Sequence, residues 1–203
     1  MKLYGAPMPA PNPRRVRIFL AEKGIELPET PVDIMKREHK SEEHRARNSL
    51  GQVPTLELDD GTCISETVAI CRYFDEVQPD PPLFGKTPAE KALVDMWVRR
   101  MEFTVMGPVG QYWRHAHPFT ARLLNQFKDF GESNREHYQG AQKWLDRELD
   151  GKPFVAGEAY SMADICLLST VDFATWIGLP LEPEFANLKV WHDRVSDRPS
   201  AGA

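Results

Sequence analysis

The chain has 203 residues, is 41% hydrophobic, and carries a formal charge of −5 from 25 Lys and Arg against 30 Asp and Glu. This composition is that of a globular protein with a sizeable core, and it excludes the collagen, coiled-coil and disordered classes. The acidic balance argues against a partner of duplex nucleic acid, which needs a basic face to neutralise phosphates. No apolar stretch is long enough to cross a membrane and no basic segment followed by an apolar run opens the chain, so we expect neither a membrane span nor a signal peptide.

The first 78 residues alternate short apolar stretches with helical ones. The order strand, helix, strand, helix, hairpin, helix predicts a thioredoxin-like α/β domain. Gly24 closes the first helix as a C-terminal cap, and Ser41 begins the second as an N-terminal cap. We expect strands at 2–4 and 30–34, helices at 14–23, from 41 onward and at 65–75, and a hairpin formed by 55–58 and 62–64.

The remainder of the chain is helical and follows a proline-rich linker. Thr87, Pro88 and Glu90 form a capping box at the start of a long helix that we expect to run toward Gly107. Ser161 to Asp164 form a second box ahead of a strongly apolar helix. We therefore predict an α/β domain followed by an all-helical bundle: domain 1–78, linker 79–87 and domain 88–203, with helices at 119–149, from 161 onward and at 183–195.

The three cysteines, Cys63, Cys71 and Cys166, are odd in number and far apart. This pattern favours reduced thiols and a cytoplasmic location. No Cys or carboxylate stands near His115 and His117 at a spacing that would complete a zinc site, so we expect no metal.

The motif Gly51-Gln52-Val53-Pro54-Thr55 places a proline at the entrance of a strand. Proline gives no N–H to a sheet, so the main chain of Val53 would face outward with its N–H and C=O unpaired if the Val53-Pro54 bond is cis. An extended peptide could pair with it, as in strand addition. The alternative is an ordinary turn before a hairpin.

A strand end passes into a helix at Ser65-Glu66-Thr67. The N–H groups from Thr67 onward would form an anion site for a carboxylate, and Glu66 would face an ammonium group. His39 and Lys40 could supply positive donors for a second carboxylate about one extended tripeptide away. The alternatives are a plain helix cap at Ser65 and a solvated charge run at residues 36–40.

These pieces occur together and in order, and with them the chain resembles the cytosolic glutathione transferases over essentially its whole length. The resemblance rests on the opening Lys-Leu-Tyr, Arg14 to Arg17, the helix end Ala21 to Gly24, Glu38 to Ser41, Gly51 to Leu56, Asp59 to Gly61, Ser65 to Thr67 and Ser161 to Asp164. It implies that His39, Lys40, Gln52, Val53, Pro54, Glu66 and Thr67 bind glutathione as a co-substrate. In that family the position of Val53 pairs with the cysteinyl backbone, that of Thr67 takes the γ-glutamyl carboxylate, and those of His39 and Lys40 lie near the glycine end.

Chemistry in this family requires glutathione as the thiolate, and most members supply a Tyr, Ser or Cys near the start of the first helix. Here no hydroxyl or thiol stands between Gly5 and Arg17. The resemblance therefore points to Asn12, whose amide can donate, together with the helix dipole. A fungal branch that also lacks the hydroxyl uses a water held by Ser and His. In this chain Gly110 stands at the position of that Ser. His115 is therefore predicted only to assist Asn12 in activating the thiol.

We expect the electrophile to lie between the domains against the aromatic stretch Phe103, Met106, Tyr112 and Trp113, whose alternative role is simple core packing. The sequence thus predicts a detoxifying glutathione transferase that conjugates glutathione to hydrophobic electrophiles. Homodimerisation through the helix near Asp95 to Arg99 is implied by the resemblance. The alternatives are a glutathione-dependent peroxidase and a non-catalytic ligand-binding or regulatory protein of the same fold.

Overall fold

The computed structural model describes residues 1–203, which divide into two compact units. The first unit comprises Met1–Leu83 together with Pro199–Ala203, and the second comprises Phe84–Arg198. None of the helices combines the length and apolar composition needed to cross a membrane.

The first unit is built on a four-stranded mixed sheet. Its strands are β1 (Lys2–Gly5), β2 (Glu29–Pro31), β3 (Thr55–Glu57) and β4 (Cys63–Ser65), in the order β2-β1-β3-β4. β1 is parallel to β2 and antiparallel to β3, and β3 and β4 form the predicted hairpin. The prediction of a strand over 30–34 was wrong in its extent, because Asp33 accepts a hydrogen bond from the Lys36 N–H and closes a turn there.

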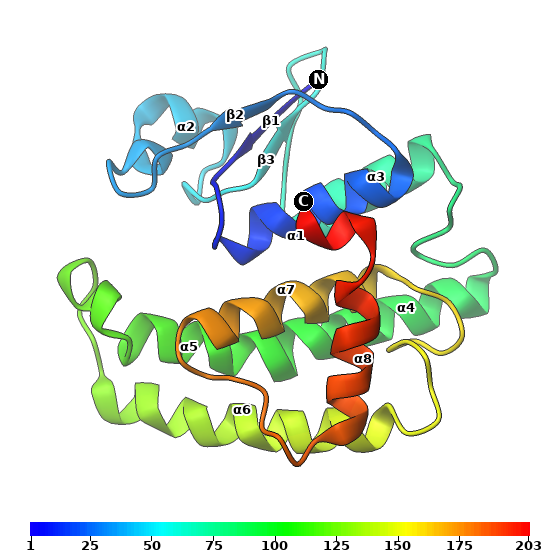
Figure 1. The fold of residues 1–203 in the computed structure, drawn as a ribbon. Helices are drawn as coiled ribbons and strands as arrows, with labels where there is room; N and C mark the ends of the chain where they lie inside the picture. Colours follow the sequence, from blue (N-terminus) through cyan, green and yellow to red (C-terminus); the bar gives the residue numbers. More distant parts are fainter. The chain divides into compact units, whose positions relative to one another are not determined.

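Three helices complete this unit: α1 (Pro11–Lys23), α2 (Glu42–Arg47) and α3 (Thr67–Val77). α1 and α3 contact each other and lie against the same face of the sheet (Figure 1). α1 begins three residues earlier than predicted, because Pro11 already has the φ angle of a first helical position. α3 begins two residues later than predicted, since Ser65 pairs with Thr55 in the sheet.

Two side chains of α1, Lys23 and Arg14, bind the segments at the two ends of the first unit. The Lys23 ammonium is buried, pairs with Asp75 at 2.6 Å, and donates to the main-chain carbonyls of Gln78 at 2.8 Å and Pro81 at 2.5 Å. The final 3-10 turn, Pro199–Gly202, returns to the same helix, where Arg14 donates to the Ala201 carbonyl at 2.8 Å. The chain after α3 and the C-terminal segment are therefore both hydrogen-bonded to side chains of α1.

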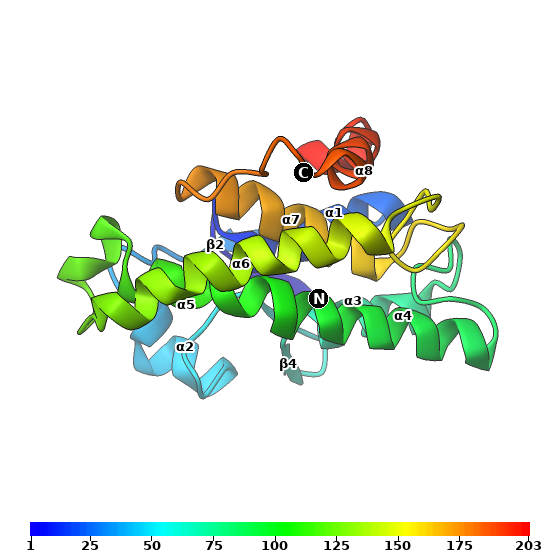
Figure 2. The same ribbon diagram turned by 90° about the horizontal axis from the view of Figure 1, so that it is seen from below.

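The second unit contains only helices. They are α4 (Pro88–Arg100), a π-helical segment (Met101–Met106), α5 (Gly107–His115), a 3-10 helix (Pro118–Arg122), α6 (Lys128–Glu148), α7 (Met162–Trp176) and α8 (Ala186–Ser196). α4, the π-helical segment and α5 follow one another without a break, and α6 runs alongside them (Figure 2). The predicted helix ending at Gly107 thus continues through a π-helical segment to His115.

The prediction of one helix over 119–149 was wrong. The loop before α6 is stabilised by side-chain hydrogen bonds to the main chain: Thr120 donates to the Trp113 carbonyl at 2.5 Å and Gln126 donates to the His117 carbonyl at 2.9 Å. α8 begins at Ala186 rather than at 183, because Asp146 accepts hydrogen bonds from the N–H groups of Asn187 and Leu188 in its first turn.

The buried Asp164 carboxylate accepts a cluster of hydrogen bonds inside the helical unit. The predicted capping box is confirmed at the start of α7, where Asp164 accepts hydrogen bonds from the N–H and the hydroxyl of Ser161. It also accepts from the Val155 N–H at 2.8 Å and from the Trp191 indole N–H, on α8, at 2.9 Å. Burial raises the pKa of Asp164 to about 6, so the group is ionised at pH 7 and all four bonds are charge-assisted.

We expect Asp164→Asn to lower the free energy of unfolding by about 2–4 kcal/mol, because an amide nitrogen would then face donors in a site that excludes water. Thermal or urea unfolding monitored by circular dichroism measures this change. Asp193→Asn is the matched control, since Asp193 makes only an exposed pair with Lys189 at 3.0 Å and such pairs contribute about 0–1 kcal/mol. Equal stability of the two variants would contradict the role assigned to Asp164.

Candidate functional site

The register of the sheet brings the predicted binding residues to one edge of the first unit. Thr55, at the start of β3, is paired with Tyr4 near the end of β1 and with Ser65 at the end of β4. The segments that leave these strand ends therefore emerge side by side. They are the loop into α1 with Asn12, the turn with Val53 and Pro54, and the start of α3 with Glu66 and Thr67.

Val53 lies outside the sheet ladder, as predicted. The Val53-Pro54 bond is cis, β3 begins only at Thr55, and no hydrogen bond within the chain uses the main-chain N–H or C=O of Val53. Both groups are thus open to an extended peptide. The side chain of Gln52 is exposed, whereas Pro54 is buried.

Glu66 and Thr67 form the N-terminus of α3. Thr67 is the first helical residue and is buried, and its N–H has no intrahelical partner because it lies in the first turn. Glu66 precedes it as the N-cap with a φ angle of 71°, in the left-handed region that residues with side chains rarely adopt. This conformation leaves an exposed carboxylate beside a helix end that favours anions.

Lys40 and His39 both lie close to Gly51, in the turn that precedes Val53. Lys40 ends a short 3-10 helix, Glu38–Lys40, and its ammonium donates to the Gly51 carbonyl at 2.7 Å and the Leu50 carbonyl at 3.0 Å. Gly51 has a φ angle of 57°, and a Cβ there would come within 2.7 Å of the His39 carbonyl. Only glycine allows this close approach.

His39 differs from the expectation of a positive donor. Burial, followed by the charges of Lys40, His44 and Arg37, lowers its pKa, which favours the neutral imidazole. The positive charge at this end of the site therefore comes from Lys40. The Nδ1 atom of His39 is buried and has no hydrogen-bond partner within the protein.

Asn12 is the second residue of α1 and provides the donors at its N-terminus. Pro11 and Pro13 have no N–H, and the Arg14 N–H already points to the Ala10 carbonyl at 3.4 Å. The outward donors of this first turn are therefore the main-chain N–H and the side-chain amide of Asn12, which is half-buried. The free N–H donors at the positive end of this helix dipole thus come from one residue.

Tyr4 carries the hydroxyl nearest to this segment in the sequence, but that group is occupied elsewhere. It donates to Glu57 at 2.8 Å, and the Arg47 guanidinium lies 4.4 Å from the ring centroid. Burial and the bond to Glu57 raise the pKa of Tyr4. Tyr4 is buried, so its ring packs in the core of the first unit.

The predicted electrophile residues lie in the second unit, and neighbouring ones face different elements. Tyr112 is buried and its hydroxyl accepts a hydrogen bond at 2.8 Å from Arg135 of α6. Trp113 instead contacts Phe173 and Trp176 of α7. Met106 is half-buried, and Phe103 is 72% exposed. The structure therefore does not gather Tyr112 and Trp113 on one surface.

His115 points toward the start of α6. Its Nδ1 accepts a hydrogen bond from the Phe127 N–H at 3.4 Å, and its ring lies against Phe127 and Phe130. Only Nε2 remains to bind a water, as the helper role would require.

Sequence reasoning missed an aromatic cluster around Trp113. The Trp113 ring stacks on Phe119 with centroids 5.4 Å apart and lies 4.7 Å from the ring of His117. Trp176, which is half exposed, packs against both Trp113 and His117. The spacing of His117, four residues after Trp113, was a usable signal, but the contribution of Trp176 depends on how α7 packs.

Comparison with known proteins shows the family. Residues 1–76 match the family model described as Glutathione S-transferase, N-terminal domain, and residues 123–199 match Glutathione S-transferase, C-terminal domain. Glutathione S-transferase 2 of Saccharomyces cerevisiae is 39% identical over 204 residues, covering 98% of this chain and 87% of the relative. The chain belongs to the glutathione S-transferase family.

The solved structures agree. The crystal structure of Gtt2 from Saccharomyces cerevisiae matches with a TM-score of 0.92 at 38% identity, covering 100% of this chain and 99% of that one. A glutathione S-transferase domain-containing protein from Marinobacter aquaeolei VT8 also matches with a TM-score of 0.92 at 38% identity, over 98% of this chain and 99% of that one. The predicted thioredoxin-like domain followed by a helix bundle is thereby confirmed, and the chain is a transferase.

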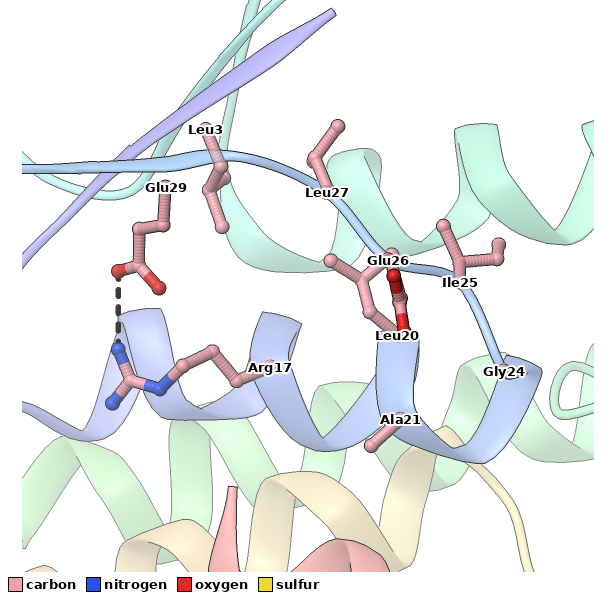
Figure 3. A pocket seen from close by; sticks show the side chains of 9 residues that line it. All are labelled: Leu3, Arg17, Leu20, Ala21, Gly24, Ile25, Glu26, Leu27 and Glu29. Atoms are coloured by element: carbon pink, nitrogen blue, oxygen red, sulfur yellow. Dashed lines mark hydrogen bonds and ion pairs between the residues drawn. The ribbon is translucent and has the colours of Figure 1, made fainter.

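A separate cavity of about 390 Å³ lies between α1 and residues 24–29 (Figure 3). Leu3, Leu20 and Leu27 contribute apolar walls, and Arg17 pairs with Glu29 at 3.2 Å at one end. None of the residues predicted to bind glutathione lines it. The residues predicted to bind glutathione lie instead near the start of β3 and the end of β4.

We expect Glu66→Gly to be about 1 kcal/mol more stable than Glu66→Ala, because glycine adopts a φ angle of 71° without steric cost and this outweighs its larger entropy loss on folding. Urea unfolding of the two variants measures the difference. Both lack the carboxylate, so the comparison isolates the backbone. Equal stabilities would show that Glu66 is not strained.

Proposed function

We propose that this transferase binds glutathione at the edge formed by Val53, Glu66 and Thr67, holds its thiol as the thiolate, and adds the sulfur to hydrophobic electrophiles. The observation that carries the proposal is the sheet register, which places an unpaired main-chain segment beside a helix N-terminus. A short peptide with a carboxylate at each end fits this arrangement.

The charges at the site match those of glutathione. In this proposal the Thr67 N–H holds the γ-glutamyl carboxylate, and Glu66 holds the ammonium on the same carbon. The main chain of Val53 pairs with the cysteinyl residue. Lys40 and the unsatisfied Nδ1 of His39 lie at the glycine end. Gln52 and Pro54 flank Val53 and determine the conformation of the turn that carries it.

Thiol activation in this proposal uses Asn12. The thiolate would accept from its amide and its main-chain N–H at the positive end of α1. A hydrogen bond to a charged group contributes about 1.5–3 kcal/mol, and 1.36 kcal/mol corresponds to one pKa unit. Two such donors are sufficient to bring a thiol with an ordinary pKa of about 8.5 into the neutral range.

The decisive test is turnover with saturating glutathione and a panel of aryl halides and isothiocyanates, for which we expect rates above the uncatalysed reaction. Asn12→Ala should raise the pKa of the bound thiol by about 1, because one of its two donors is lost. The ultraviolet absorbance of the thiolate, titrated against pH, measures this pKa.

The control for that titration is Asn125→Ala, since Asn125 is exposed in the loop before α6. No rate with any electrophile would contradict the proposed activity. A bound thiol whose pKa is the same in Asn12→Ala and in Asn125→Ala would remove Asn12 from the mechanism and leave the activity itself standing.

For the electrophile, we propose the apolar and aromatic side chains of Phe103, Met106 and Trp113 in the helical unit. His115, which points toward the start of α6 instead, would bind a water through Nε2. Tyr112 would support this face from the core. Apolar and aromatic side chains of this kind accept varied hydrophobic groups.

We further propose that this transferase is a cytoplasmic homodimer that acts in detoxification. None of its three cysteines is in a disulfide, and α4 exposes Leu93 and Met96 at a helical spacing. Met96→Glu should convert the dimer to a monomer, because a charge on that face would be desolvated on association. Sedimentation equilibrium measures this, with Val190→Glu on α8, an exposed apolar residue, as the control. An unchanged dimer would contradict the assignment of α4.

A further inference from the structure

We propose that His44 and Asn48 are positioning residues for glutathione, which fix the Gln52 carbonyl and thereby aim the Val53 N–H at the peptide. The inference rests on the proposed function and assigns a role to two residues outside the predicted site. Neither residue would contact glutathione itself.

Both side chains converge on one oxygen atom. The Nε2 atom of His44, on α2, lies 2.8 Å from the Gln52 carbonyl oxygen, and the Asn48 amide donates to the same oxygen at 2.9 Å. His44 is 3% exposed and Asn48 is 6% exposed. The Thr55 hydroxyl, at the start of β3, donates a longer bond to the same oxygen at 3.4 Å. The two shorter bonds match the two lone pairs of a carbonyl oxygen.

The two donors are themselves held in place. The His44 main-chain N–H donates to Ser41 at 3.1 Å, and its ring meets the edge of Tyr4 with centroids 6.4 Å apart. The Asn48 side-chain oxygen accepts from the Leu50 N–H at 3.1 Å, which fixes the orientation of the amide. Because Nε2 of His44 faces a carbonyl, it is the nitrogen that carries the hydrogen in the neutral ring.

The consequence follows from peptide geometry. The Gln52 C=O and the Val53 N–H belong to the same planar peptide unit, and this bond is trans. In a trans peptide the two groups point in opposite directions. Drawing the oxygen toward α2 therefore turns the Val53 N–H away from α2, where a bound peptide can accept from it. The sheet contributes to this orientation only through the 3.4 Å bond from Thr55, because Gln52 and Val53 themselves lie outside the strands.

The test measures the dissociation constant of S-methylglutathione by calorimetry for the wild-type chain and four variants. This ligand has no thiol, so the result does not depend on thiol activation. His44→Phe keeps the ring and removes the donor, and Asn48→Asp keeps the acceptor for the Leu50 N–H and removes the donor. His44→Gln restores a nitrogen donor near the position of Nε2. His137→Phe, an exposed residue on α6, is the matched control.

We expect His44→Phe and Asn48→Asp each to weaken binding about three- to tenfold, the range for one hydrogen bond. His44→Gln should remain within about twofold of wild type, and His137→Phe should be unchanged. The KM for glutathione should rise by the same factor in the two donor variants, while the KM for the electrophile at saturating glutathione stays constant. Rescue by His44→Gln distinguishes positioning from a general loosening of α2, which any replacement would cause.

Wild-type affinity in both donor variants would overturn the proposal, as would equally weak binding by His44→Gln and His44→Phe. If one donor variant fails to fold, the other still decides. No binding of S-methylglutathione by the wild-type chain would instead contradict the proposed function, so the two failures are distinguishable.

Discussion

The pairing of Thr55 with both Tyr4 and Ser65 is the constraint on which the candidate site depends. It aligns the carboxyl ends of β1 and β4 with the start of β3, so three connecting segments distant in sequence meet at one edge. Register in a sheet has a period of two, and a slip by one residue would turn every side chain to the other face. The buried Leu3 and Leu56, which are partners in neighbouring strands, oppose such a slip.

Local main-chain groups, rather than the total charge, determine what this edge can bind. The chain carries a net charge of −5, yet the edge presents the N-termini of α1 and α3 and the Lys40 ammonium. Short-range donors at helix ends act on a bound carboxylate more strongly than distant surface charges, which are screened within about 10 Å. Because the prolines on both sides of Asn12 have no N–H, Asn12 supplies the free donors at the N-terminus of α1. The absence of a hydroxyl there is consistent with an amide in its place.

Much of the fold was predictable because its signals are local. Gly24, Ser41 and the box at Ser161 to Asp164 end or begin helices through hydrogen bonds within a few residues, and each was found. The turn at Val53 was predicted for the same reason. The π-helical segment at Met101–Met106 has no such signal, and the helix that was expected to stop at Gly107 continues as α5 to His115. The loop before α6 depends on Thr120 and Gln126, whose partners lie more than five residues away in the chain, so spacing alone could not show it.

The roles of His44 and Trp176 illustrate what a sequence cannot supply. His44 follows the charged run at residues 36–40, and its burial against the Gln52 carbonyl depends only on the path of the turn. A crystal structure of the protein with glutathione tests the central claim most directly. The account predicts two main-chain hydrogen bonds between Val53 and the cysteinyl residue, and the Thr67 N–H on the γ-glutamyl carboxylate. Glutathione lodged in the cavity between α1 and residues 24–29, with Val53 unpaired, would contradict it.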